Sequence, residues 1–388
     1  MAMGALAESH ANKGNPPTLA SLQALRGLAA LLVLFTHLSE QMTYRLGNHP
    51  FPSAIGSGRI GVDIFFVLSG FIMFWTSHND FGSPGAWRSF LHRRLLRVFP
   101  VYWMATLLLL LAGLLDERFC RVRDLGPKEL VLSLLLLPQT GAPILGQAWT
   151  LVHEVRFYIL FSFLLCFPWR WAAKILWMWA ALCCAVLVMS HWSPQILVQS
   201  IAGRGCNYLF HPSSLQFILG VVAAMGTLRV NCSKGVAAGA LLAGMVLIPA
   251  SMLAAAVWTP FTKYYFLLIF TGPALILVWG AAVAECCQIV TVPRFLVWMG
   301  EASYSTYLLH LLLIVPLVWW PPEALLRVGG MFPWAGLTIS LTMGCSWLFH
   351  RAVEHPLHQF ARRCSAKSGV GVTRLLNSLR PEDRRSAP

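Results

Sequence analysis

The chain has 388 residues, of which 57% are hydrophobic and only 11% are charged, and its mean hydropathy is +0.64. Because soluble proteins carry about 25% charged residues, this composition excludes an ordinary soluble protein and predicts one that crosses a membrane several times. The positive residues behind the formal net charge of +14 fall in short loops between apolar segments, where they set topology. We therefore expect contact with membrane lipids and no nucleic acid partner.

Ten apolar segments are candidate transmembrane helices, since a span needs about 20 mostly apolar residues. They cover residues 21–40, 60–79, 99–115, 149–168, 171–190, 213–228, 235–258, 264–284, 301–320 and 333–352. The segment 130–148 has a short apolar run followed by prolines and glycines. We expect it to form an interfacial or half-inserted hairpin that does not cross the membrane.

The predicted fold class is all-α: a polytopic, integral membrane helical bundle of about ten transmembrane helices plus an interfacial basic helix. We expect cytoplasmic tails at 1–20 and 356–388 around a membrane domain at 21–355. Lys and Arg are denser in the loops on the side of the tails, whereas the loop 116–129 carries four charges of each sign. Because positive loops stay in the cytoplasm, we expect both termini there and the protein in the inner (plasma) membrane.

The first span carries Arg26 near its start and His37 near its end. Eleven residues correspond to ~16 Å of helix and about three full turns, so the two side chains lie on one face. Ionisable residues inside a span tend to face a polar interior and to mark functional sites. The alternative is that Arg26 extends to the membrane surface and His37 caps the other end.

The second span, GVDIFFVLSGF, places Asp63 in its first turn, where the helix dipole favours a negative charge. Asp63 is therefore either a structural cap or a substrate contact. Gly61 and Gly70 are small enough to let another helix approach closely.

The next basic segment, WRSFLHRRLLRVFPVYW, places Arg94 and Arg97 one turn apart, beside Arg93. We expect a surface helix that ends at Pro100, before the third span. Guanidinium groups pair well with phosphate oxygens, so the functional interpretation is a docking site for a phosphorylated cytoplasmic donor. Binding of anionic lipid headgroups is the alternative.

The fourth span places Glu154 and Tyr158 on one face, four residues apart. A carboxylate within an apolar span is costly unless it is paired. Glu154 is expected either to pair with Arg156 or Arg26, or to bind substrate hydroxyls or orient His37.

Tyr304, Tyr307 and His310 recur every third residue in the ninth span and predict a polar stripe along a cavity. Two hydroxyls and an imidazole on one stripe suit a sugar-like acceptor, although His310 could instead bond only within the bundle. Trp149 stands at the boundary of the fourth span.

The ten cysteines show no C-x-x-C spacing, and we interpret the adjacent pairs as small packing residues. A disulfide between Cys120 and Cys206 is the alternative for those two. No pattern of metal ligands occurs, so we expect no metal site.

Five motifs in order give the chain a resemblance to a known family. They are the arginine and histidine of the first span, GVDIFFVLSGF, RRLLRVFP, WTLVHEVRFY and ASYSTYLLH. Together they resemble the membrane acyltransferase-3 family, and most closely its exopolysaccharide O-acetyltransferase branch. The resemblance covers roughly residues 20 to 355. His153 departs from the pattern, which has a tyrosine or serine-like residue before the glutamate.

The resemblance implies transfer of an acyl group, usually acetyl from cytoplasmic acetyl-CoA, to a carbohydrate hydroxyl. Acetyl-CoA is then a co-substrate, no cofactor is bound, and polysaccharide biosynthesis proteins are possible partners. An imidazole can accept a proton near neutral pH, so His37 would either deprotonate the acceptor or carry the acyl group itself. Arg26 would stabilise negative charge or anchor the donor's phosphates.

The remaining candidates divide by substrate. Glu154 joins the catalytic set of Arg26 and His37. The donor residues are Arg93, Arg94 and Arg97, and the acceptor residues are Asp63, Trp149, Tyr158, Tyr304, Tyr307 and His310. The alternative functions are a transporter or flippase of lipid-linked sugars, a membrane protein without catalysis, or an acetyltransferase for a lipid or small metabolite.

Overall fold

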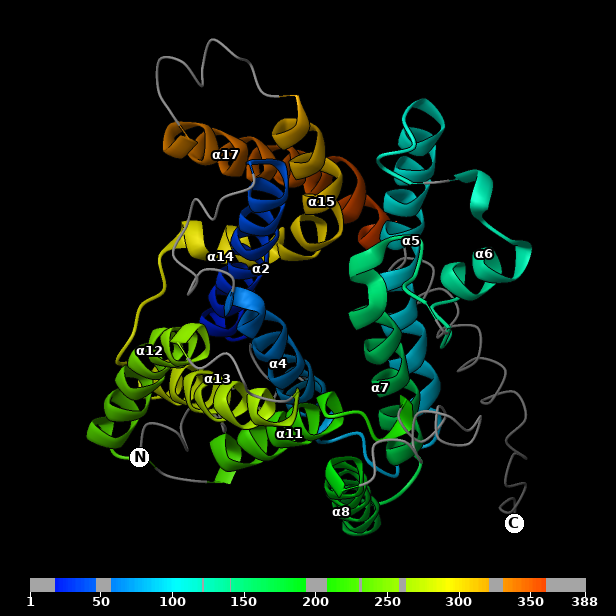
Figure 1. Ribbon diagram of the computed structural model, residues 1–388. Helices are drawn as coiled ribbons and strands as arrows, with labels where there is room; N and C mark the ends of the chain where they lie inside the picture. The colour runs from blue at the N-terminus through cyan, green and yellow to red at the C-terminus, as the bar shows by residue number, and fades with distance from the viewer. Residues whose placement is uncertain are drawn as a thin grey trace, which may run out of the picture.

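A computed structural model describes residues 18–46, 57–120, 122–139, 141–192, 208–229, 232–257, 263–320 and 331–360. Every regular element in these ranges is helical, and each of the ten predicted spans corresponds to a helix (Figure 1). These are α2 (Ala20–Leu46), α4 (Ile60–Ser77), α5 (Ala86–Leu115), α7 (Trp149–Leu165), α8 (Trp169–Trp192), α11 (Ser213–Arg229), α12 (Lys234–Val257), α13 (Lys263–Cys286), α15 (Ser303–Trp319) and α17 (Met331–Phe349).

Seven of the described helices are long and apolar enough to cross a membrane. The number is eight if α14 (Arg294–Glu301) and α15 form one span, which bends by 66° between them. Large apolar side chains remain exposed on the outer helices, for example Leu111 and Leu115 on α5 and Val246 on α12. Lipid solvates such surfaces, so the polytopic helical membrane fold is confirmed.

The prediction of a separate basic surface helix ending at Pro100 is wrong, because α5 continues through the proline as one helix of 30 residues. A proline inside a helix removes a hydrogen bond and crowds the preceding turn. Here the carbonyls of that turn accept hydrogen bonds from other helices. Arg97 O accepts one from His358 Nε2 at 3.2 Å, and Val98 O accepts one from the Tyr304 hydroxyl at 2.9 Å. Tertiary donors thus stabilise the continuous helix.

As predicted, the described part of the segment 130–148 contains no helix long enough to cross a membrane. It contains only α6 (Pro127–Leu134), an irregular return and the short helix η3 (Gly146–Ala148). Eight residues of helix span about 12 Å, which is too short to cross a bilayer. The Tyr102 hydroxyl of α5 donates to Ser133 O at 2.7 Å and holds α6 against that helix. The proposed disulfide partner Cys206 lies outside the described residues.

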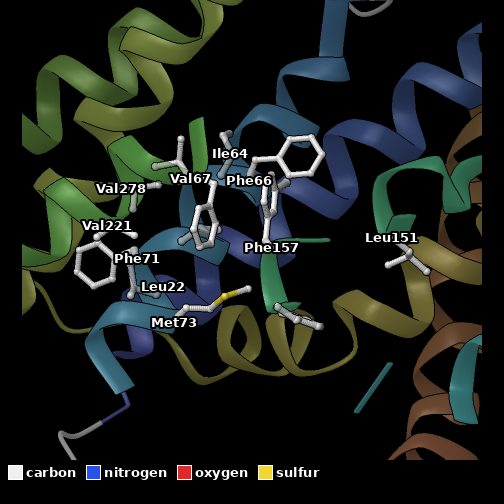
Figure 2. Packing of buried hydrophobic residues seen from close by; sticks show 14 of the residues in the cluster. Leu22, Ile64, Phe66, Val67, Phe71, Met73, Leu151, Phe157, Val221 and Val278 are labelled. Atoms are coloured by element: carbon white, nitrogen blue, oxygen red, sulfur yellow. The ribbon is translucent and has the colours of Figure 1, made fainter. Parts of the chain in front are cut away.

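The main core lies where α4 packs against α11, α7 and α13 (Figure 2). Phe66, Phe71 and Phe157 are buried there. A Cβ atom on Gly70 would collide with the backbone carbonyl of Phe217, and one on Gly220 would collide with that of Val67. The predicted close approach at Gly70 is therefore confirmed.

Helix α2 runs through the middle of the molecule and packs against α4, α13, α14 and α15 (Figure 1). Its first turn is capped from α13, because the Glu285 carboxylate accepts hydrogen bonds from the backbone N–H groups of Ala20 at 2.9 Å and Ser21 at 2.7 Å. A Cβ atom on Gly300 would meet the backbone of Gln23. The bend between α14 and α15 therefore lies directly against α2.

The chain leaves α17 through a five-residue π-helix, His350–Glu354, and continues as α-helix to residue 360. This extension carries His358 onto α5, where it donates to Arg97 O. A segment beyond the last predicted span thus contacts the functional region described next.

Candidate active site

A cavity of about 830 Å³, part of it open to solvent, lies between α2, α4, α5, α7 and α15. The structure brings together seven of the twelve predicted site residues on its wall: Arg26, Arg94, Arg97, Glu154, Tyr158, Tyr304 and Tyr307. They come from four helices that are far apart in the sequence.

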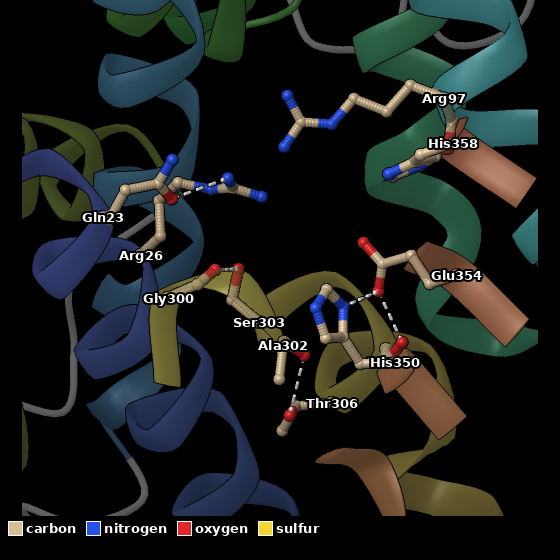
Figure 3. Close-up of polar contacts among 11 residues, drawn as sticks. Gln23, Arg26, Arg97, Gly300, Ala302, Ser303, Thr306, His350, Glu354 and His358 are labelled. Atoms are coloured by element: carbon tan, nitrogen blue, oxygen red, sulfur yellow. Dashed lines mark hydrogen bonds and ion pairs between the residues drawn. The ribbon is translucent and has the colours of Figure 1, made fainter. Parts of the chain in front are cut away.

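Three guanidinium groups line the cavity. Arg26 on α2 and Arg97 on α5 enter the same space from opposite sides (Figure 3). Arg26 Nη1 donates to Gln23 Oε1 at 3.0 Å, which fixes its orientation. Arg94 lies 5.8 Å from the centre of the Tyr158 ring, and its Nη2 is 3.4 Å from Thr76 Oγ1. These arginines converge where an anionic group would fit between them.

The carboxylate of the cavity is Glu154, which accepts a hydrogen bond from the Tyr158 hydroxyl, as their spacing predicts. Arg156 points the other way and donates to Tyr208 O and to Ser213 Oγ. The predicted Glu154–Arg156 pair is therefore wrong, because the two side chains project from different faces of α7. Glu154 instead interacts electrostatically with Arg26.

Tyr304 and Tyr307 line the cavity, but their hydroxyl protons are already used. Tyr304 donates to Val98 O at 2.9 Å and Tyr307 to Gln147 O at 2.8 Å. The Tyr307 hydroxyl is also 2.7 Å from Thr150 Oγ1. Lone pairs on both phenolic oxygens remain able to accept a hydrogen bond from a substrate.

The two histidines lie beside the cavity and outside its wall. His310 contacts Tyr307 with a ring separation of 5.8 Å, and His37 stacks on His310 at 5.1 Å. His310 Nδ1 donates to Tyr307 O at 2.7 Å, and His37 Nδ1 donates to Glu40 Oε2 at 2.9 Å. The two imidazoles and Tyr307 thus connect His37 to the cavity.

Glu40 is a residue that the sequence interpretation missed, because we considered Glu154 as the carboxylate that could orient His37. Glu40 holds His37 Nδ1 from one turn further along the same helix. This leaves Nε2 of a neutral His37 unprotonated and able to accept a proton. The three-residue spacing of a histidine and a glutamate was the available signal.

The other predicted residues lie elsewhere. Asp63 accepts a hydrogen bond from Gln216 Nε2, which also donates to Thr271 Oγ1 at 3.1 Å, so Asp63 belongs to a contact between α4, α11 and α13. Trp149 is 40% exposed at the start of α7, next to the cavity wall. Arg93 is exposed and does not line the cavity.

A second missed group comes from the π-helix after α17. Glu354 Oε2 accepts hydrogen bonds from His350 Nδ1 at 2.9 Å and from Ser305 Oγ at 2.6 Å (Figure 3). The carboxylate is 2% exposed and interacts electrostatically with Arg26. The four-residue spacing of His350 and Glu354 was the signal, although the contact of Glu354 with α15 depends on the fold.

Residues 19–351 match a family model described as an acyltransferase domain. The chain belongs to the acyltransferase-3 family. It is 29% identical over 282 residues to the exopolysaccharide production protein ExoZ of Rhizobium meliloti, covering 65% of this chain and 75% of that protein. It is 27% identical over 323 residues to the acyltransferase MdmB of Streptomyces mycarofaciens, covering 76% of this chain and 79% of that protein. No solved structure matches the chain.

The chain is therefore a membrane acyltransferase, and the predicted resemblance is confirmed. The acyltransferase has a cavity lined by arginines beside Arg26 of α2, and a pair of stacked imidazoles beside the other end of that helix, at His37. Arginines can bind an anionic donor, and an imidazole can act on a hydroxyl acceptor. Family membership identifies the reaction type, whereas the donor and the acceptor have to be argued from the site.

Proposed function

We propose that this acyltransferase moves an acetyl group from cytoplasmic acetyl-CoA to a hydroxyl of an exported or cell-surface polysaccharide, or of its lipid-linked precursor. The observation that carries the proposal is the presence of Arg26, Arg94 and Arg97 on the wall of one cavity, together with Tyr307, which contacts His310 and through it His37. The polysaccharide acceptor is supported by the name of the relative from Rhizobium meliloti.

Acetyl-CoA carries several phosphate groups at one end and the reactive thioester at the other. A guanidinium group binds phosphate oxygens through two parallel hydrogen bonds. Arg94 and Arg97, on the same face of α5, would hold the phosphates together with Arg26. Arg93 is exposed and is better suited to bind lipid headgroups or to set the membrane topology.

The thioester would extend along α2 toward His37. Arg26 and His37 are separated by ~16 Å of helix, and the pantetheine arm of the donor is long and thin. Tyr307 lines the cavity and contacts His310, which stacks on His37. Tyr307 therefore lies on the route between the phosphate site and the imidazole.

In this proposal His37 is the general base. Glu40 accepts a hydrogen bond from His37 Nδ1–H, which leaves Nε2 to take the proton of the acceptor hydroxyl, as in carboxylate–histidine pairs of hydrolases. The acceptor oxygen then bonds to the acyl carbon while the carbon–sulfur bond breaks. Glu154, Tyr158 and Tyr304 would bind other acceptor hydroxyls.

The test is to incubate membranes that contain the chain with acetyl-CoA labelled in its acetyl group and to separate the products. Label in the polysaccharide or in its lipid-linked precursor is the expected result. Label confined to free lipids or small metabolites would contradict the acceptor, and the absence of membrane-dependent transfer would contradict the donor. Membranes without the chain are the control.

The orientation has its own test. Reporter fusions within 116–129 and at the C-terminus should report opposite sides of the inner membrane, with the C-terminus in the cytoplasm. This follows from the higher density of Lys and Arg on the side of the tails. Reports from the same side would contradict the prediction that the segment 130–148 does not cross the membrane.

A further inference from the structure

The end of α2 beyond His37 carries a stripe of polar and aromatic side chains. Glu40, Gln41 and Tyr44 follow His37 by three, four and seven residues, so the four side chains share one face of the helix. Tyr44 is 76% exposed. The His37 side chain is 32% exposed, although it does not line the cavity of the arginines. The imidazole can therefore be reached from outside that cavity, where the stripe begins.

Trp319, at the end of α15, joins this stripe. Its Nε1 donates to Gln41 Oε1 at 3.4 Å, and its ring packs on that of Tyr44 with 5.6 Å between the ring centres. Tryptophan and tyrosine are common at membrane surfaces, where they anchor helices among lipid headgroups. Trp319 instead uses its indole N–H within the protein, and both partners belong to the helix that carries His37. These contacts hold its ring beside the His37 end of α2.

Trp320 extends this surface toward the end of α5. The Arg118 guanidinium lies 4.3 Å from the centre of the Trp320 ring, and the Phe119 ring lies 6.2 Å from it. Asp116 fixes the guanidinium, because its carboxylate accepts a hydrogen bond from Arg118 Nε at 3.0 Å and lies 2.8 Å from Nη2. Trp320 is itself 47% exposed. The last turns of α2, α15 and α5 lie at the same end of the molecule (Figure 1).

We call Gln41, Tyr44, Trp319, Trp320 and Arg118 the aromatic platform. It combines three rings with side-chain amide, hydroxyl and guanidinium groups. Ligand sites are commonly built from aromatic side chains and a few placed polar groups. A sugar ring presents C–H groups on its faces and hydroxyls at its edge, so it can stack on a ring and bond to the polar groups beside it. The platform therefore suits a carbohydrate.

The aromatic platform is longer than a single sugar unit. Helix α2 rises about 10 Å from His37 to Tyr44, and Trp320 with Arg118 continues the surface onto neighbouring segments. A small metabolite or a monosaccharide with its hydroxyl at His37 would leave most of the platform without a contact. A carbohydrate chain with one unit at His37 would place its adjoining units on the platform.

We propose that the aromatic platform binds the sugar units that adjoin the acetylated one, so that the acceptor is a carbohydrate chain of at least two units. The inference rests on the proposed function for the acetyl transfer itself. The chain lies across Trp320 and Tyr44 with one hydroxyl at His37, and the donor occupies the cavity of the arginines. Both substrates can be bound at once, because no residue of the platform lines that cavity.

The test uses the full chain purified in detergent, with oligosaccharides of graded length released by partial hydrolysis of the host's de-O-acetylated polysaccharide. The variant Tyr44→Ala/Trp320→Ala removes two exposed rings. We expect its apparent Michaelis constant for the longer oligosaccharides to rise roughly tenfold, while its affinity for acetyl-CoA and its rate at saturating acceptor stay near wild type. Tyr44→Phe/Trp320→Phe keeps both positions aromatic and should retain the wild-type constant. Trp347→Ala is the matched control, since Trp347 on α17 is 45% exposed and lies outside the platform.

An unchanged Michaelis constant in the folded double-alanine variant would overturn the platform, and an equal rise in Trp347→Ala would assign these rings to membrane anchoring. If the double variant does not fold, Tyr44→Ala alone provides the same comparison.

Equilibrium binding of the same oligosaccharides without acetyl-CoA reads the platform without any transfer. Binding that wild type shows and the double-alanine variant loses, in a protein that acetylates no carbohydrate, would contradict only the proposed function. Wild-type protein that fails to bind the longer oligosaccharides, or binds single sugar units equally well, would contradict the platform.

Discussion

The two ends of α2 present different environments on one helix. Around Arg26 the wall carries three guanidinium groups and a carboxylate and is open to solvent. Around His37 the neighbours are a stacked imidazole and an apolar cluster that contains Leu34, Leu38 and Trp334. In the proposed function, this difference separates the binding of a charged donor from proton transfer along the helix, with Tyr307 and His310 between them.

The sharpest test of this separation is His37→Ala. The variant should insert normally and bind acetyl-CoA with unchanged affinity, because His37 lies outside the cavity wall. Transfer should fall 10²–10⁴-fold, the typical contribution of a positioned general base. The measurement is the initial rate of acetyl transfer in membranes. His78→Ala is the control, since that histidine bonds to Trp75 O at the end of α4. Activity above a tenth of wild type would contradict the role of His37.

The converse test is Arg94→Lys/Arg97→Lys, which keeps every charge but removes the planar forks. A charge-assisted hydrogen bond contributes about 1.5–3 kcal/mol, so the affinity for acetyl-CoA should fall by about 2–3 kcal/mol, or roughly a hundredfold. The rate at saturating donor should change less. Arg93→Lys is the matched control, because Arg93 is exposed outside the cavity. Unchanged donor binding in inserted protein would assign these arginines to topology alone.

Glu354→Gln tests the Arg26 end of α2 in the opposite direction, because it should strengthen donor binding. The amide can still accept a hydrogen bond from Ser305, but the negative charge that faces Arg26 is removed. An anionic donor should then bind more tightly, by about 1 kcal/mol or roughly fivefold. Titration with acetyl-CoA measures the change. The matched variant Glu40→Gln, at the histidine end, should lower the transfer rate and leave donor affinity unchanged. Weaker donor binding in Glu354→Gln would show that Glu354 acts chiefly by positioning the C-terminal helix.

The smallest effect on chemistry is expected from Glu285→Ala, which removes the cap of α2. Loss of a helix cap costs about 1–2 kcal/mol of stability, so the protein should unfold at a lower temperature in detergent. Transfer per folded molecule should stay near wild type, since the Glu285 carboxylate bonds to the backbone of Ala20 and Ser21 and does not line the cavity. The exposed Glu301 provides the control variant Glu301→Ala. An equal loss of stability in both variants would contradict the capping role.

The sequence by itself determined the helices and much of the cavity. Apolar length fixes where a membrane helix runs, and all ten predicted segments are helical in the described residues. Spacing within a helix identified pairs such as Glu154 and Tyr158, because residues four apart share a face. The same rule placed Arg94 and Arg97 together on α5. The family motifs supplied the reaction type, which the match of residues 19–351 confirms.

Only the tertiary structure decided which neighbour each face meets. Asp63 bonds to Gln216, 153 residues away, and Glu354 bonds to Ser305 on another helix. Helix α5 continues through Pro100 because Tyr304 and His358 supply donors from elsewhere in the chain. Helical periodicity orients side chains about one axis. It carries no information on how two axes pack, and that packing determines whether a buried polar group lines a site or bonds within the bundle.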